Sequence, residues 1–325
     1  MANGNDMSWE ESAAKTAALV AALEERVLGQ AEVVRTLVAG YLSGGHVLLE
    51  GPPGVGKTLL ARSLAEALGL GFQRVQFTPD LMPADLVGTN VFDQSRSRFE
   101  LHRGPVFTDV LMADEINRTP PKTQSALLEA MEEKQVSIDG ETLTLAREFF
   151  VVATLNPIEF EGVYPLPEAQ LDRFMLRIVM GLPAPEAEGE ILRRAVAGTL
   201  AGWGASRGPA PAVVDAREAR ALRSASSRAH VRDDLLDYVA ALARAVRASL
   251  HVELGPSPRA TLALLEAARG AALVAERDYV VPDDVKLMLP VCWAHRLELT
   301  AEAELEGQSA AAVLRAAADG VSVPH

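Results

Sequence analysis

Gly51-Pro52-Pro53-Gly54-Val55-Gly56-Lys57-Thr58 is the stretch on which the rest of this chain depends. It fits the pattern Gly, four residues, Gly-Lys-Ser/Thr of a phosphate-binding P-loop. An apolar run, Val47 to Leu49, precedes it, and a helical pattern that begins with Leu59 and Leu60 follows it. Strand, Gly-rich turn and helix N-terminus form the context that the motif requires. A chance Gly-rich turn explains the motif but not both flanks.

The chemistry of this stretch is the capture of an anion. Glycines let the backbone curl so that successive N–H groups point at phosphates, and the start of the helix adds partial positive charge. Lys57 is placed to reach the β- and γ-phosphates, and the Thr58 hydroxyl to bind magnesium. The sequence therefore predicts ATP and Mg²⁺ as cofactors. The expected nucleotide-binding residues here are Gly51, Pro52, Pro53, Gly54, Val55, Gly56, Lys57, Thr58 and Leu59.

A second motif follows about sixty residues later, which is the separation expected after a P-loop. Val110 to Ala113 is an apolar strand pattern, and Asp114-Glu115 ends it, as in a Walker B motif. Asp114 is expected to hold magnesium, and Glu115 to orient and polarise the attacking water. In a parallel α/β sheet, ligands bind at the carboxyl ends of the strands, so the two motifs are expected at one edge.

Three further positions have two readings each. Asn156 follows the buried strand pattern 148–154, where it either contacts the γ-phosphate and the water or forms a turn before Pro157. Gln76 either orients the catalytic glutamate or faces solvent. The segment before the first strand either contacts adenine or only connects two helices; its residues are Val27, Leu28 and Gly29.

Composition sets the class of protein. The chain has 325 residues, 49% of them hydrophobic, and a formal net charge of −13, which argues against a protein that mainly grips nucleic-acid phosphates. The single cysteine, Cys292, excludes a disulfide framework and lies in an apolar helical pattern typical of a core. No apolar run approaches the length of a membrane span, and the first ten residues do not resemble a signal peptide. We expect a soluble, cytoplasmic protein.

The predicted fold is an α/β P-loop core, a parallel sheet flanked by helices, followed by a smaller all-helical lid. Residues 1–26 form a tail and helix, 27–181 the core, and 182–325 the lid. Residues 78–107 are predicted to form an insertion, and 135–147 a hairpin that turns at Asp-Gly. The insertion contains Arg96, Arg98 and Arg103, which form either a contact surface or an ordinary solvated loop.

Taken together, these motifs resemble the MoxR family of AAA+ ATPases, from about residue 27 to residue 304. The strings that carry the resemblance are Gly51 to Thr58, Asp114 to Arg118, Pro121 to Glu133, Asn156 to Glu159, Tyr164 to Phe174 and Ser257 to Ala260.

The resemblance implies roles for matched positions. Asn156 looks like sensor 1, Arg173 like an arginine finger offered to the neighbouring subunit, and Arg259 like sensor 2, touching the γ-phosphate of its own subunit. The insertion resembles the family's helix-2 insert, and residues 135–147 its pre-sensor-1 hairpin. A homo-oligomeric ring, by resemblance a hexamer, is implied. Family members are described as chaperone-like ATPases that act on proteins with a von Willebrand factor A domain.

Two other functions compete with an ATP-driven ring that remodels a protein. A nucleic-acid motor is one, but acidic residues outnumber basic ones in the hairpin 133–148 and no aromatic residue lies at its tip. A nucleotide-switched scaffold that barely hydrolyses ATP is the other, and the intact Glu115 and Arg173 argue against it.

Overall fold

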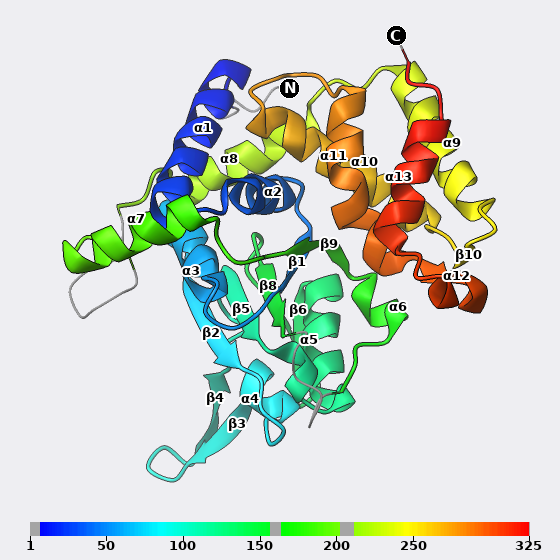
Figure 1. Cartoon of the computed structure of the whole chain (residues 1–325). Helices are drawn as coiled ribbons and strands as arrows, with labels where there is room; N and C mark the ends of the chain where they lie inside the picture. The colour runs from blue at the N-terminus through cyan, green and yellow to red at the C-terminus, as the bar shows by residue number, and fades with distance from the viewer. Residues whose placement is uncertain (1–6, 157–163, 202–210, 325) are drawn as a thin grey trace, which may run out of the picture.

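The computed structural model describes residues 7–156, 164–201 and 211–324 (Figure 1). Three expected features lie wholly or mostly outside the described residues: the start of the N-terminal tail, the Pro157 to Glu159 part of the family motif, and the Gly/Pro-rich loop near residues 201–211.

A five-stranded parallel sheet forms the centre of the molecule, with strand order β2-β5-β8-β1-β9. The strands are β1 (His46–Glu50), β2 (Phe72–Gln76), β5 (Val110–Asp114), β8 (Phe150–Leu155) and β9 (Phe174–Val179). The three central strands are almost fully buried, because continuous apolar runs suit a sheet covered on both faces.

Side-chain alternation divides the buried residues into two cores, one on each face of the sheet. On β1, Val47 and Leu49 belong to one core and Leu48 to the other. The first core includes residues of α1 (Trp9–Arg26), α2 (Ala31–Leu42) and α3 (Lys57–Ala67). The second includes Leu127 and Leu128 of α5 (Pro121–Glu133). The predicted α/β core is therefore confirmed.

Two antiparallel hairpins lie outside the central sheet. The insertion consists of α4 (Pro83–Val87) and the hairpin β3 (Gly88–Asp93) with β4 (Arg98–Arg103), which projects from the body in Figure 1. The Asp-Gly hairpin is β6 (Gln135–Ile138) with β7 (Glu141–Thr144). Asn90 Nδ2 donates to Asp139 Oδ2 at 2.8 Å, which ties the two hairpins together.

The C-terminal region is mostly helical. The short helix α6 (Glu168–Leu171) precedes β9 and belongs to the core, and the helices after it are α7 (Pro185–Val196), α8 (Ala216–Ser227), α9 (Asp233–Arg247), α10 (Pro258–Val274), α11 (Pro282–Trp293), α12 (Ala301–Leu305) and α13 (Ala310–Gly320). The predicted helical lid is confirmed, except that β10 (Val252–Leu254) pairs with β11 (Glu298–Leu299) in a short antiparallel sheet within it. These segments are too short and too weakly patterned for the sequence to distinguish them from loops.

The helix α10 connects the lid to the core. Ser257 caps its N-terminus by accepting from the Ala260 N–H, with Pro258 in the first turn, where a missing N–H costs nothing. Its apolar residues join the same core as α2, and Gly270 permits the close approach, since a Cβ there would lie 2.4 Å from the Ala39 carbonyl oxygen. The lid therefore packs on the N-terminal helices.

Candidate functional site

The P-loop connects the end of β1 to the start of α3. Gly54 and Gly56 have φ of +85° and +98°, a conformation that favours glycine. The Lys57 amine donates to the carbonyl oxygens of Gly51 and, at 3.1 Å, Pro52, so the side chain folds back over the loop. Gly51 has no room for a side chain, because a Cβ would lie 2.3 Å from the Met180 carbonyl oxygen. The strand, turn and helix predicted around the motif are present.

Asp114 lies at the end of β5 and is held on both carboxylate oxygens. Oδ1 accepts from the Thr154 hydroxyl at 2.6 Å, and Oδ2 accepts from Arg74 Nη2 at 2.6 Å and Nε at 3.0 Å. The carboxylate is nearly buried, with a side-chain exposure of 10%. Its charge is thus paired and hydrogen-bonded, as a buried charge must be. Mg²⁺ prefers oxygen ligands such as carboxylates and hydroxyls, so the side chains of Asp114 and Thr58 are suitable ligands for that ion.

Glu115 has a left-handed backbone, with φ of +56°, which is uncommon outside glycine and turns the chain sharply after β5. Its N–H donates to Thr154 Oγ1 at 2.8 Å. Its carboxylate accepts from Gln76 Nε2 at 2.6 Å and from Arg118 Nη1 at 3.2 Å. Gln76 is exposed yet contacts the glutamate, so the first of its two readings is the one that the geometry supports.

Asn156 follows β8, which lies between β1 and β5 in the sheet. The register of β8 places Leu155 beside Glu50, the residue before the P-loop. It also places Ala153 beside Ala113 of the Walker B strand. Asn156 is buried and comes directly after this strand. It therefore lies between the P-loop and the Walker B strand.

The segment Val27 to Gly29 lies beside the chain that leaves β9. Gln30 Nε2 donates to the Gly181 carbonyl oxygen at 2.9 Å, and a Cβ on Gly29 would meet Ala187 Cβ at 2.7 Å. Met180, just before Gly181, donates its N–H to Glu50 at the end of β1 at 2.7 Å. This places the segment near the P-loop, which is consistent with a contact to adenine.

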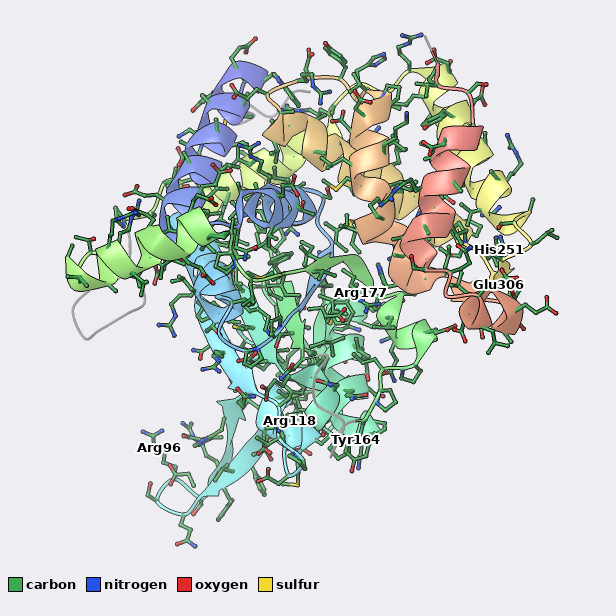
Figure 2. All side chains as sticks on the ribbon, viewed as in Figure 1. Arg96, Arg118, Tyr164, Arg177, His251 and Glu306 are labelled. Atoms are coloured by element: carbon green, nitrogen blue, oxygen red, sulfur yellow. The ribbon has the colours of Figure 1, made fainter. Side chains whose placement is uncertain are left out.

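The end of β5 continues into a short 3₁₀ turn, Ile116–Arg118. Arg118 and Tyr164 lie close together in Figure 2, because the Tyr164 N–H donates to the Asn117 carbonyl oxygen at 2.6 Å. Gln124 is buried and its Nε2 donates to the carbonyl oxygens of Ile116, Thr119 and Tyr164. This polar core holds the turn that carries Glu115 and Arg118.

Arg173 lies near the amino-terminal ends of the parallel strands, whereas the P-loop lies at their carboxyl ends. It precedes Phe174, the first residue of β9, which pairs with His46, the first residue of β1. The P-loop begins after Glu50, the last residue of β1. At about 3.3 Å per residue, the strand alone separates the two ends by roughly 13 Å. Arg173 therefore lies at the end of β9 that is remote from the phosphate-binding loop of its own chain.

Arg259 lies beside Arg173 and not beside the P-loop. Glu132 Oε1 is 3.2 Å from Arg259 Nη1, and Glu132 Oε2 is 3.2 Å from Arg173 Nη2. Both arginines line one hollow of about 200 Å³, together with His46. The structure does not place Arg259 beside the P-loop of its own chain, the position that the family resemblance implies, because the lid packs against α2 and Arg259 contacts Glu132 in the last turn of α5.

The lid also holds the backbone around Arg173. Arg296, whose side chain is only 5% exposed, donates from Nη2 to the carbonyl oxygens of Asp172 and Phe174, each at 2.9 Å, and pairs with the Asp172 carboxylate. His295 Nε2 donates to the Phe174 carbonyl oxygen at 3.0 Å. Burial lowers the pKa of His295 to about 3, so the ring stays neutral near pH 7. The lid thus fixes the residues on both sides of Arg173.

Two arginines of the insertion form ion pairs and the third lies over an aromatic ring, which favours the ordinary solvated loop over a contact surface. Arg96 and Arg98 contact Glu100 at 2.6 and 2.7 Å, and Arg103 lies over the Phe107 ring. Figure 2 shows Arg96 on the projecting hairpin, far from the sheet. Cys292 is buried as predicted, and burial raises the pKa of its thiol to about 11.

Sequence reasoning missed four residues that hold the site, namely Arg74, Glu132, Thr154 and Arg296. Arg74 is two residues before Gln76 on β2. Because residues i and i+2 of a strand point to the same face, the sequence could have predicted that Arg74 lies beside Gln76. Nothing in the sequence indicates that Arg296 reaches a segment more than 120 residues earlier.

Comparison with known proteins identifies the family. Residues 46–176 match the model of the ATPase family associated with various cellular activities (AAA), and residues 244–317 match the AAA lid domain. The chain is 43% identical over 308 residues to Chaperone MoxR1 of Mycobacterium tuberculosis, covering 92% of this chain and 80% of that protein. The chain belongs to the MoxR family of AAA ATPases. As a member of that family it is an ATPase.

Two further comparisons support the assignment to this family. The chain is 34% identical over 317 residues to Protein MoxR of Paracoccus denitrificans, covering 86% of this chain and 87% of that protein. A crystal structure of a Cytophaga hutchinsonii protein assigned to the ATPases superposes with a TM-score of 0.88 at 37% identity, over 97% of this chain and 96% of that one. None of the helices in the described part of the chain is long and apolar enough to cross a membrane.

Thr154 generates a prediction, because its hydroxyl joins Asp114 to the Glu115 N–H. Thr154→Val removes that hydroxyl at nearly constant volume and leaves a buried carboxylate oxygen and an N–H without their partner. We expect ATP hydrolysis to slow roughly 10- to 100-fold, since small misplacements of a catalytic group have effects of this size. Steady-state ATPase assays measure it. Thr154→Ser keeps the hydroxyl and is the control; equal rates for the Val and Ser variants would contradict the role.

Proposed function

We propose that this MoxR-family ATPase works as a head-to-tail ring in which each nucleotide site is completed by the neighbouring copy, and that it uses ATP hydrolysis to remodel a partner protein. The observation that carries the proposal is the separation of Lys57 from Arg173 and Arg259, which lie at opposite edges of one sheet. A single copy cannot bring both arginines to its own phosphates.

The residues at the carboxyl edge of the sheet divide the chemistry among them. Bound ATP and Mg²⁺ supply the transferred phosphoryl group and the charge that neutralises it, with Thr58 and Asp114 as the protein ligands of the ion. Lys57 and the loop amides hold the β- and γ-phosphates, and Glu115 accepts a proton from the attacking water. Gln76 donates to the Glu115 carboxylate and aims it. We assign the contact to the γ-phosphate to Asn156, which follows the strand between the two motifs.

The neighbouring copy supplies the remaining positive charge. Arg173 and Arg259 act in trans, on the phosphates bound by the next copy, which requires the same head-to-tail contact at every interface. Such contacts close into a ring when the rotation permits, and a hexamer is the number that the family resemblance suggests. Charge supplied by a finger arginine accelerates hydrolysis by roughly 10³- to 10⁵-fold.

The substrate is a protein rather than a nucleic acid. Chaperone MoxR1 is named as a chaperone, and we extend that activity to this chain. A protein with a von Willebrand factor A domain is the partner that the family resemblance suggests, in the cytoplasm. The paired arginines of the insertion and the net charge of −13 argue against a nucleic-acid motor.

Mixing two inactive variants tests the shared site. Lys57→Ala loses its own phosphate contact but still presents Arg173, whereas Arg173→Ala keeps an intact pocket. We expect each variant alone to be nearly inactive and the mixture to recover part of the ATPase rate, because some interfaces pair an intact pocket with an intact finger. Copurification of differently tagged variants confirms that mixed assemblies form. A mixture that assembles and stays inactive would show that Arg173 does not act in trans.

Trapping tests the remodelling activity. Glu115→Gln keeps the shape of the side chain and removes the base, so ATP should stay bound without hydrolysis. We expect ATP to increase the retention of a von Willebrand factor A domain protein by immobilised Glu115→Gln, and Lys57→Ala to retain none. Salt-sensitive, several-fold stimulation of the wild-type ATPase by DNA or RNA, with no retained protein, would contradict the proposal and favour a nucleic-acid motor.

A further inference from the structure

Glu132 lies between the two arginines that the proposed function assigns to the neighbouring site. Each of its carboxylate oxygens faces a different guanidinium, Oε2 that of Arg173 and Oε1 that of Arg259, both at 3.2 Å. The two arginines come from different parts of the chain, one from the segment before β9 and one from the first turn of α10. Glu132 is therefore a direct side-chain link between the core and the lid at this edge.

The position of Glu132 is fixed by its helix. It follows Met131 in the last turn of α5, and Leu127, Leu128 and Met131 of that helix are buried in the core beneath. The Met131 carbonyl oxygen accepts from His46 Nε2 at 3.2 Å, which ties the end of α5 to the start of β1. The carboxylate thus projects from a rigid element, whereas the arginines that it contacts have long, flexible side chains.

Charge explains what Glu132 does for the arginines. Two guanidinium groups in one hollow of about 200 Å³ repel each other, and Lys134 and Arg296 also line that hollow. A carboxylate between them offsets the repulsion and fixes their spacing. The side chains of Arg173, Glu132 and Arg259 are 31%, 37% and 56% exposed, so these ion pairs contribute little to stability. Their effect falls on geometry, which governs catalytic rates more steeply.

We propose that Glu132 is a positioning residue for the trans site: it holds Arg173 and Arg259 side by side so that both reach the phosphates of the neighbouring copy together. The proposal rests on the proposed function, because it assumes that the arginines act across the interface. Glu132 lies near the start of β9, at the other end of the strands from the P-loop of its own chain.

The first test is Glu132→Gln, with Glu133→Gln as the matched control. Glu133 is the next residue of the same helix and is exposed. The control substitution removes the same charge, because it is also a change from Glu to Gln. We expect Glu132→Gln to lower kcat about tenfold, with unchanged affinity for a fluorescent ATP analogue and an unchanged unfolding midpoint. Glu133→Gln should match the unsubstituted protein. A Glu132→Gln enzyme with normal kcat would overturn the proposal.

The second test asks whether Glu132 serves the nucleotide site of its own copy or that of the neighbouring copy. If Glu132 were merely structural, rescue would not depend on which variant it is mixed with. Mixed with Lys57→Ala, Glu132→Gln should gain activity, because the Lys57→Ala copies provide intact arginines to its pocket. Mixed with Arg173→Ala, it should gain none, because both variants are defective on the same side. Rescue by Arg173→Ala instead would show that Glu132 serves its own pocket.

The shared nucleotide site and the role of Glu132 within it can be tested separately. If Arg173→Ala and Lys57→Ala coassemble without recovering activity, the shared site is wrong and the role of Glu132 falls with it. If that mixture recovers but Glu132→Gln with Lys57→Ala does not, the shared site stands and only the role of Glu132 is wrong.

Discussion

The pairing of β1 with β9 is the constraint on which the site depends. In this parallel register, His46 lies beside Phe174 and Glu50 beside Val179. The strand that delivers the chain into the P-loop therefore also fixes where Arg173 emerges, one strand length away at the other edge. Arg177 Nε donates to the Glu50 carboxylate at 2.6 Å and supports this pairing next to the P-loop. The P-loop and Arg173 are thus held at opposite ends of one rigid strand pair.

The two edges are built differently, and the difference suits their roles. At the carboxyl edge, Asp114, Thr154 and Glu115 form a compact network with Arg74 and Gln76, all within hydrogen-bonding distance. Such networks fix catalytic groups in one arrangement. At the amino edge, the contacts join core to lid, and half-exposed arginines lie on a shared carboxylate. In the proposed ring, a movement of the lid would move the residues around Arg173 and so link the nucleotide state of one copy to hydrolysis in the next.

The sequence predicted what local patterns encode. The strand, turn and helix around Lys57, the carboxylates after β5 and the Asp-Gly hairpin follow from motif spacing and periodicity over a few residues. The contact between Arg259 and Glu132 was not predicted, because it depends on how α10 packs against α2, which no local pattern specifies. The Arg296 clamp on Asp172 and Phe174 was missed for the same reason, since it joins residues distant in sequence. Gln76 was left open because its partner lies on another strand.

The most direct measurement is a structure of the Glu115→Gln protein assembled with ATP and Mg²⁺. The account predicts that the guanidinium groups of Arg173 and Arg259 from one copy lie within hydrogen-bonding distance, about 3 Å, of the γ-phosphate bound by its neighbour. It also predicts that Glu132 remains between them. An assembly in which Arg259 instead contacts the phosphate of its own copy, with Arg173 far from any nucleotide, would contradict it.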